Sequence, residues 1–222
     1  MVSIVLTIKL AVRRISFTIM PLLLVLLLIS SPAGLAMDRF NDLNANHWAY
    51  TYIIKLSDMG IINGYPDGSF CPEKTISRAE FIRLVISLLE TPRETQEIFK
   101  DIPETDWANP WVAAAVRRGV IIPEEYGAEL GVHQPITREE AVVWMVRMAG
   151  EPEHTGELTF SDNDSIGHQG EIASAVEMGL VTGMPDNTFV PKGITTRAQA
   201  AVMISRLSDT LITRPVAPSQ IS

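Results

Sequence analysis

The chain has 222 residues, of which 46% are hydrophobic and 20% are charged, and its formal net charge is −8. This composition is typical of a globular protein with an ordinary core and argues against a disordered chain. The acidic balance argues against nucleic acid as a partner, because such binding depends on neutralising phosphates with Lys and Arg. The single cysteine, Cys71, excludes an internal disulfide, so we expect packing to supply the stability.

The first predicted element is a secretory signal peptide over residues 1–36. Basic residues precede an apolar run centred on 20–29, and small residues follow it, in the order of n-region, h-region and cleavage site. We expect cleavage after Ala33 or Ala36. The alternative is an uncleaved membrane anchor, but the apolar stretch is short for a span of ~20 residues and Pro21 interrupts it. Contact with a membrane is therefore expected only through this segment, if it stays uncleaved.

The next part of the chain repeats one pattern three times. Each copy opens with Phe-x-Asp, at Phe40, Phe99 and Phe160. A short helical stretch follows and ends at a glycine, as expected of a helix C-cap; a turn-rich loop and a second helix complete the copy. Because one such helix pair buries too little surface to be stable alone, the three copies should share a core. We predict three helix–loop–helix repeats and a flexible tail, which cover 37–92, 93–152, 153–210 and 211–222.

Each second helix begins with the same tetrad, Ser/Thr-Arg-x-Glu/Gln. Its first and last residues fit a capping box, in which the hydroxyl accepts from the N3 amide and the Glu or Gln side chain accepts from the N-cap amide. Each box is expected to contribute about 1 kcal/mol. The structural capping residues are Ser77, Glu80, Thr137, Glu140, Thr196 and Gln199.

The second tetrad position holds an arginine in every copy: Arg78, Arg138 and Arg197. A cation at the first helical position lies beside the positive end of the helix dipole and is slightly unfavourable there. Two interpretations stay open. The guanidinium and free helix amides could form an anion receptor, or each arginine could pair with a nearby carboxylate. The candidate carboxylates are Asp42, Asp101 and Asp162.

The sequence shows no pattern of a catalytic, cofactor or metal site. The four histidines lack ligand spacing, and the loops lack the Asp-x-Asp-x-Asp run of a calcium site. There is no phosphate-binding loop and no serine elbow. Because the acidic residues recur with the repeat, they are better interpreted as caps and turns than as the carboxylate pair of a glycosidase. The pattern therefore favours a binding module over an enzyme.

The order of Phe-x-Asp, Trp-Ala, a Gly-Tyr-Pro-Asp-Gly loop and the tetrad resembles the S-layer homology (SLH) domain, in three tandem copies over about 40–208. The first copy matches almost throughout. The second has lost Gly-Tyr-Pro-Asp-Gly, and the third has His168 in place of the tryptophan. The resemblance implies a mainly α fold, in which three helix–loop–helix repeats form a pseudo-threefold, three-pronged spindle.

The resemblance also implies a function. Such triplets hold exported proteins non-covalently on the cell wall, so we expect a secreted protein at the cell envelope surface. The implied partner is an anionic secondary cell-wall polysaccharide, typically carrying a ketal-linked pyruvate, or a modified peptidoglycan, bound in grooves between repeats. An envelope structural or adaptor protein with degenerate glycan sites and an unknown protein partner remains the alternative.

Site residues follow from the resemblance position by position. The tetrad arginines would bind the anion, with Arg78 expected to matter most, and the Phe-x-Asp carboxylates would orient the arginines or bind sugar hydroxyls. Trp48 and Trp107 are candidates for the wall that faces the sugar, although a core position is the alternative for each. Gly64 and Gly183 would let the backbone approach the sugar.

Overall fold

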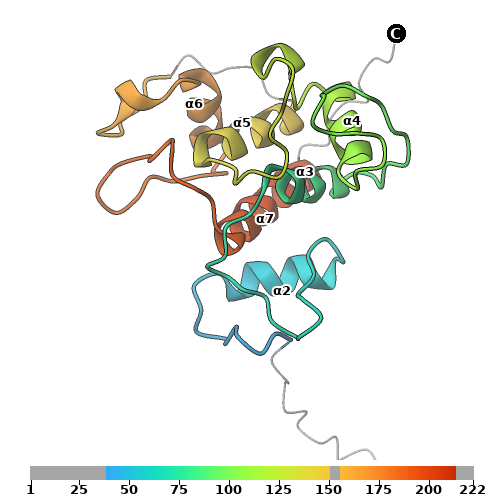
Figure 1. Cartoon of the computed structure of the whole chain (residues 1–222). Helices are drawn as coiled ribbons and strands as arrows, with labels where there is room; N and C mark the ends of the chain where they lie inside the picture. Colours follow the sequence, from blue (N-terminus) through green and yellow to red (C-terminus); the bar gives the residue numbers. More distant parts are fainter. Residues whose placement is uncertain (1–38, 151–155, 214–222) are drawn as a thin grey trace, which may run out of the picture. The chain divides into compact units, whose positions relative to one another are not determined.

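The computed structural model describes residues 39–150 and 156–213 (Figure 1). The predicted signal peptide, 1–36, lies outside this part. The described residues contain six α-helices and no β-strand, which confirms the predicted mainly α fold. None of these helices is both long enough and apolar enough to cross a membrane.

Each repeat supplies two α-helices, and the second of each pair begins at the tetrad arginine. The helices are α2 (Tyr50–Asp58), α3 (Arg78–Ser87), α4 (Asn109–Arg117), α5 (Arg138–Ala149), α6 (Gln169–Glu177) and α7 (Arg197–Thr213), with 3-10 turns η1 (Pro123–Glu125) and η2 (Asn163–Ser165). Because α7 continues to Thr213 and buries Leu211, the boundary predicted for the tail at 211 is wrong by three residues. The last helix is therefore longer than the sequence pattern indicated.

A glycine follows each first helix in the left-handed conformation, at φ 72° for Gly60, 68° for Gly119 and 70° for Gly179. Only glycine adopts this conformation without a steric cost. The predicted C-cap glycines are therefore confirmed, and each one turns the chain into the loop of its repeat.

The helices pair between repeats. α2 packs on α7, α4 packs on α3, and α6 packs on α5, while α3, α5 and α7 contact one another at the centre (Figure 1). The first helix of each repeat therefore covers the second helix of the preceding repeat, and the first repeat closes the cycle by covering the last. No repeat can bury its apolar faces without both neighbours.

A closed cycle of backbone hydrogen bonds joins the residues that precede the three tetrads. Ile76 N–H donates to the Thr195 carbonyl at 3.0 Å, Thr195 N–H to the Ile136 carbonyl at 3.0 Å, and Ile136 N–H to the Ile76 carbonyl at 3.1 Å. All three residues are at most 1% exposed. Equivalent positions of the three repeats thus meet in the core, which is the pseudo-threefold relation that the resemblance implied.

Candidate functional site

The first amides of the tetrad helices are already hydrogen-bonded. Arg78 N–H donates to the Gln134 carbonyl at 3.0 Å and Ala79 N–H to the Val132 carbonyl at 2.7 Å, both in the loop of the next repeat. The N3 amide donates to the N-cap hydroxyl. The expectation of free amides beside each arginine is therefore wrong, because the neighbouring loop occupies them. The equivalent acceptors for α5 and α7 are the carbonyls of Gly193, Pro191, Lys74 and Pro72.

Two of the three capping boxes have both of their halves. Ser77 N–H donates to Glu80 at 2.9 Å, and Thr196 N–H donates to Gln199 Oε1 at 3.1 Å. In the second repeat the hydroxyl half is present, but Glu140 reaches away from its own helix start. Both of its carboxylate oxygens accept from the arginine of the first repeat instead, so this box differs from the prediction.

The Phe-x-Asp carboxylates hold the loops of their own repeats. Each accepts two successive loop amides: Asp42 at 2.7 and 2.7 Å, Asp101 at 3.0 and 2.7 Å, and Asp162 at 2.7 and 2.8 Å. In the described part of the chain none of them pairs with a tetrad arginine, so the arginine-orienting role is wrong. The hydrogen bonds from Phe189 N–H and then Val190 N–H lower the pKa of Asp162. A bond from these carboxylates to sugar hydroxyls stays a prediction.

The second amide bound by each of these carboxylates belongs to a residue in the left-handed region. The φ angles are 56° for Cys71, 64° for Gly131 and 60° for Val190. Gly131 fits this conformation, whereas a β-branched residue is strained in it. Two of the three loops therefore fold against the preference of the residue at this position.

Val190→Gly should raise the free energy of unfolding by about 0.5–1 kcal/mol, because relief of the left-handed strain exceeds the entropy that glycine costs. Val190 is 39% exposed, so little packing is lost. Urea denaturation followed by circular dichroism measures the change. The reciprocal variant, Gly131→Val, should be destabilised; a lower midpoint for Val190→Gly would contradict the strain argument.

The space beside Gly64 and beside Gly183 is filled by the phenylalanine of Phe-x-Asp in the same repeat. A Cβ added at Gly64 would lie 2.6 Å from Phe40 Cε1, and one added at Gly183 would lie 2.7 Å from Phe160 Cε1. These glycines are therefore required by internal packing. The approach of a sugar to their backbone stays a prediction.

Trp48 and Trp107 are 57% and 50% exposed, so the core alternative for both is wrong. Trp48 stacks on His47 with ring centroids 5.6 Å apart. Trp107 lies 6.3 Å from the ring of His133. Both indoles offer an apolar face to solvent at the start of a first helix, as a sugar-facing wall requires.

Arg197 is built into the protein interior. It is 9% exposed, its Nε donates to the Phe70 carbonyl at 2.9 Å, and its NH2 donates to the Asn63 carbonyl at 3.1 Å. Its guanidinium carbon lies 4.8 Å from the Tyr65 ring centroid and 4.7 Å from that of Phe70. These contacts join the third repeat to the loop of the first and use most of the guanidinium.

Arg78 is neutralised by a carboxylate. Its Nε donates to the two carboxylate oxygens of Glu140 at 2.8 and 2.9 Å, and the two side chains are 20% and 12% exposed. Glu139 lines the same cavity and accepts from the backbone and ring of His168. Arg78 therefore lies in a groove of mixed charge, which we call the Arg78 groove.

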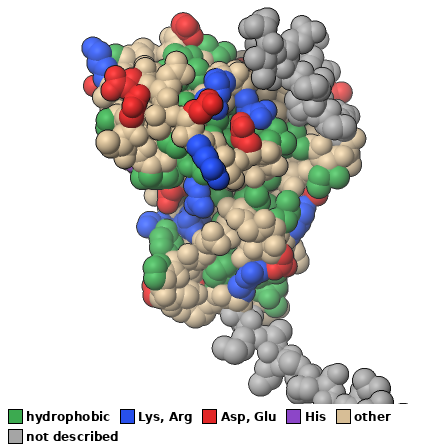
Figure 2. Space-filling view, turned by 90° about the vertical axis from the view of Figure 1, so that its right-hand side faces the viewer, with side chains coloured by type: hydrophobic (Ala, Val, Ile, Leu, Met, Phe, Trp, Pro, Cys, Tyr) green, Lys and Arg blue, Asp and Glu red, His purple; other side chains and the backbone are tan. Residues whose placement is uncertain are grey.

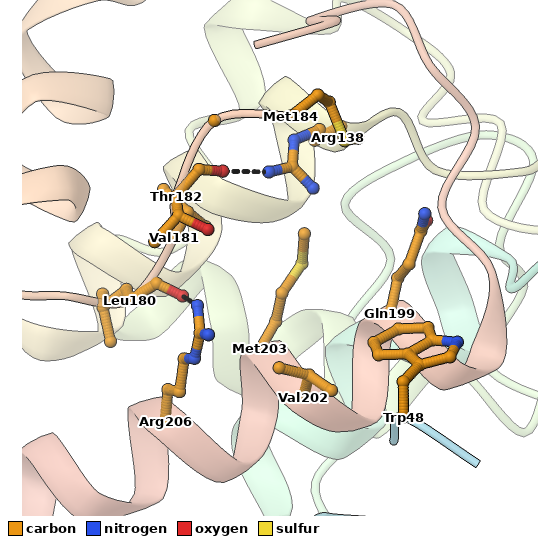
Figure 3. A pocket seen from close by; sticks show the side chains of 11 residues that line it. Trp48, Arg138, Leu180, Val181, Thr182, Met184, Gln199, Val202, Met203 and Arg206 are labelled. Atoms are coloured by element: carbon orange, nitrogen blue, oxygen red, sulfur yellow. Dashed lines mark hydrogen bonds between the residues drawn. The ribbon is translucent and has the colours of Figure 1, made fainter. Parts of the chain in front are cut away.

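Arg138 lies in a different setting, shown in Figure 3. Its NH2 donates to the Thr182 carbonyl at 2.7 Å, and among the described residues it has no carboxylate partner. Arg206 of α7 lines the same cavity and donates to the Leu180 carbonyl at 3.3 Å. Burial and then the positive charge of Arg206 lower the pKa of Arg138. Two cations thus share one cavity, with Trp48 on its far side (Figure 3).

This cavity, the Arg138 groove, contains residues from all three repeats. Arg138 comes from the second repeat, Trp48 from the first, and the loop 180–184 and Gln199 from the third. No acidic residue is among its lining side chains in the described structure. Elsewhere, on the face seen in Figure 2, Lys and Arg side chains lie among Asp and Glu side chains. The lining of the Arg138 groove therefore differs from the mixed charge seen on that face (Figure 2).

Two residues of the groove, Arg206 and Gln199, were not predicted from the sequence as parts of a binding site. The positions equivalent to Arg206 in the other repeats hold Ser87 and Arg147, so the repeat pattern gave no signal. Within the described residues, no group of three or more His, Cys, Asp or Glu side chains could hold a metal ion. The site is thus one of cations, an exposed indole and backbone carbonyls.

The S-layer homology domain matches the chain over residues 39–82, 98–142 and 159–201. An exoglucanase of Acetivibrio thermocellus is 34% identical over 189 residues, 81% of this chain and 17% of that protein. An amylopullulanase of Thermoanaerobacterium thermosulfurigenes is 36% identical over 184 residues, 79% of this chain and 10% of that protein. The S-layer protein sap of Bacillus anthracis is 28% identical over 182 residues, 80% of this chain and 22% of that protein.

The chain spans between 10% and 22% of the length of these three relatives. The shared part is the region of the three tandem matches. In this region the structure has its helix pairs and the cycle of hydrogen bonds between the residues that precede the tetrads. The chain therefore belongs to the S-layer homology domain family.

Proposed function

We propose that this protein attaches non-covalently to the cell wall by binding an anionic, pyruvylated secondary cell-wall polysaccharide, with the Arg138 groove as the principal site. The observation that carries the proposal is the pair Arg138 and Arg206 in one cavity without an acidic lining residue. A carboxylate of a ketal-linked pyruvate is a planar anion, and guanidinium groups bind such anions through charge-assisted hydrogen bonds.

The sugar that carries the anion needs a second contact, and Trp48 supplies one. Its indole is 57% exposed at the edge of the groove, so its apolar face is available to the apolar face of a sugar ring. An exposed aromatic ring beside two arginines suits an anionic sugar better than a free inorganic anion, because the ring can contact the sugar while the arginines bind its charge.

Family membership and the S-layer relatives indicate a secreted protein at the cell surface. They also support attachment to cell-wall polymers in general; the polysaccharide and its pyruvate are our proposal. Enzymes occur among the relatives, but they match this chain over a small part of their length. We propose a non-catalytic anchoring role for the described residues.

The test is sedimentation of the protein with purified cell walls, before and after acid removal of the polysaccharide and its pyruvate. We expect the protein to pellet with intact walls and to stay in solution with stripped walls. Arg138→Ala should lower the affinity for intact walls roughly tenfold or more, because a charge-assisted contact is lost. Arg83→Ala is the matched control, since Arg83 is exposed on α3. Equal pelleting with stripped walls, or full binding by Arg138→Ala, would overturn the proposal.

A further inference from the structure

We infer that the last tetrad residue selects which groove accepts an anion, and that Gln199 is the residue that keeps the Arg138 groove open. The inference rests on the proposed function and adds a specificity-determining position to it. In each groove the arginine of one repeat faces the last tetrad residue of the next repeat. That residue is Glu140 opposite Arg78 and Gln199 opposite Arg138.

The two grooves show the two outcomes. Glu140 gives both of its oxygens to Arg78 Nε, at 2.8 and 2.9 Å. Gln199 stays at its own helix start, where its Oε1 accepts from Thr196 N–H at 3.1 Å. A neutral amide cannot neutralise a guanidinium. Arg138 therefore keeps its charge for a ligand, whereas the charge of Arg78 is already matched.

The surroundings increase this difference. The cavity beside Arg78 is lined by three carboxylates, Glu125, Glu139 and Glu140, and also by Lys192 and His168. An anion entering it must displace a partly buried ion pair and face further carboxylates, and such a pair is screened less by water than a surface pair. An anion entering the Arg138 groove meets Arg138 and Arg206, and no carboxylate is among the described lining residues.

The remaining tetrad arginine does not offer a third open groove. Arg197 is 9% exposed and already donates to two carbonyls. The residue at the last tetrad position of the first repeat, Glu80, accepts from Ser77 N–H at 2.9 Å and from Ser77 Oγ at 3.1 Å. Of the described tetrad arginines, Arg138 alone combines an open cavity with an unmatched charge.

The experiment changes the charge of the last tetrad residue and keeps the shape of its side chain nearly the same. Gln199→Glu and Glu140→Gln are nearly isosteric, and each keeps an oxygen that can accept from the N-cap amide. The probe is a methyl hexoside that carries one pyruvate ketal, and the same hexoside without the ketal is its control. Isothermal titration calorimetry of the full chain measures affinity and stoichiometry, and urea denaturation checks that each variant folds.

We expect Gln199→Glu to weaken binding of the ketal hexoside roughly tenfold or more, at an unchanged urea midpoint. Gln199→Ala should bind within about threefold of the wild type, because it removes the amide without adding a charge. Glu140→Gln should free Arg78 and add a second binding event, which Arg78→Ala should remove again. Glu80→Gln is the matched control and should leave the affinity unchanged.

The failures are distinguishable. If the wild-type chain binds neither the ketal hexoside nor intact walls, the proposed function is wrong. If the wild type binds and Gln199→Glu binds equally well, the charge-selection inference is wrong while the proposed function stands. If Gln199→Ala is as weak as Gln199→Glu, the amide itself holds the ligand and charge selection is again overturned.

Discussion

A fragment of residues 39–92 is expected to show no cooperative unfolding transition, although it contains a complete sequence repeat. Its two helices do not have each other as main partners: α2 packs on α7, and α3 packs on α4, α5 and α7. The fragment would expose the core faces of both helices. It would also lose the loop carbonyls that cap α3, which come from Gln134 and Val132 of the second repeat.

The measurement compares far-ultraviolet circular dichroism and urea denaturation of the fragment with those of residues 39–213. The longer chain should unfold in one transition, because every repeat is covered by both of its neighbours. The fragment should lack a sigmoidal transition and have little helix, since isolated helices of this length are marginal in water. A fragment that melts cooperatively at the midpoint of the longer chain would disprove the shared core.

Arg197→Ala is expected to lower the free energy of unfolding by about 3 kcal/mol. The change removes two charge-assisted hydrogen bonds to carbonyls and the contact of the guanidinium with Tyr65 and Phe70. One of these carbonyls belongs to Phe70, which is fully buried. Leaving a buried acceptor unpaired costs about 1–3 kcal/mol by itself, and the lost ring contacts add to this.

Urea denaturation of Arg197→Ala, Arg138→Ala and the exposed control Arg83→Ala tests this difference between the tetrad arginines. Arg197→Lys should recover only part of the loss, because an ammonium cannot donate in two directions with the geometry of a guanidinium. Arg138→Ala should lower the midpoint less than Arg197→Ala, because the loss of one carbonyl hydrogen bond and one ring contact is partly offset by removal of a cation that lies close to Arg206 and to the positive end of α5. Equal urea midpoints for Arg197→Ala and Arg138→Ala would mean that the burial of Arg197 adds nothing to the free energy of unfolding.

The different fates of the three tetrad arginines have one physical cause. Each guanidinium crosses to the neighbouring repeat, so its environment depends on residues that are distant in sequence. Arg78 meets Glu140, Arg138 meets the Thr182 carbonyl and Arg206, and Arg197 meets the carbonyls of the first repeat. The same arginine position therefore holds one neutralised, one unmatched and one buried side chain in the three repeats. The fullest motif, in the first repeat, is thus not the one whose arginine lacks a carboxylate partner.

The sequence by itself determined the mainly α fold, the three repeats, the C-cap glycines and the family. All of these follow from local patterns, because a capping residue, a turn or an apolar stripe acts over a few residues. The same local logic placed the start of each tetrad helix at its arginine. It could not place the Phe-x-Asp carboxylates on loop amides, since those amides lie 27 to 30 residues further along the chain.

Only the tertiary structure decided which tetrad arginine is paired with a carboxylate, which is buried and which keeps an unmatched charge. The cyclic packing brings the start of one repeat's helix against the loop of the next, and closes the cycle between the third repeat and the first. Arg78 and Glu140 are 62 residues apart, and Arg197 and Phe70 are 127 residues apart. Whether such a pair meets depends on burial and on the path of the other repeats. The residue spacing within one repeat carries no information about either.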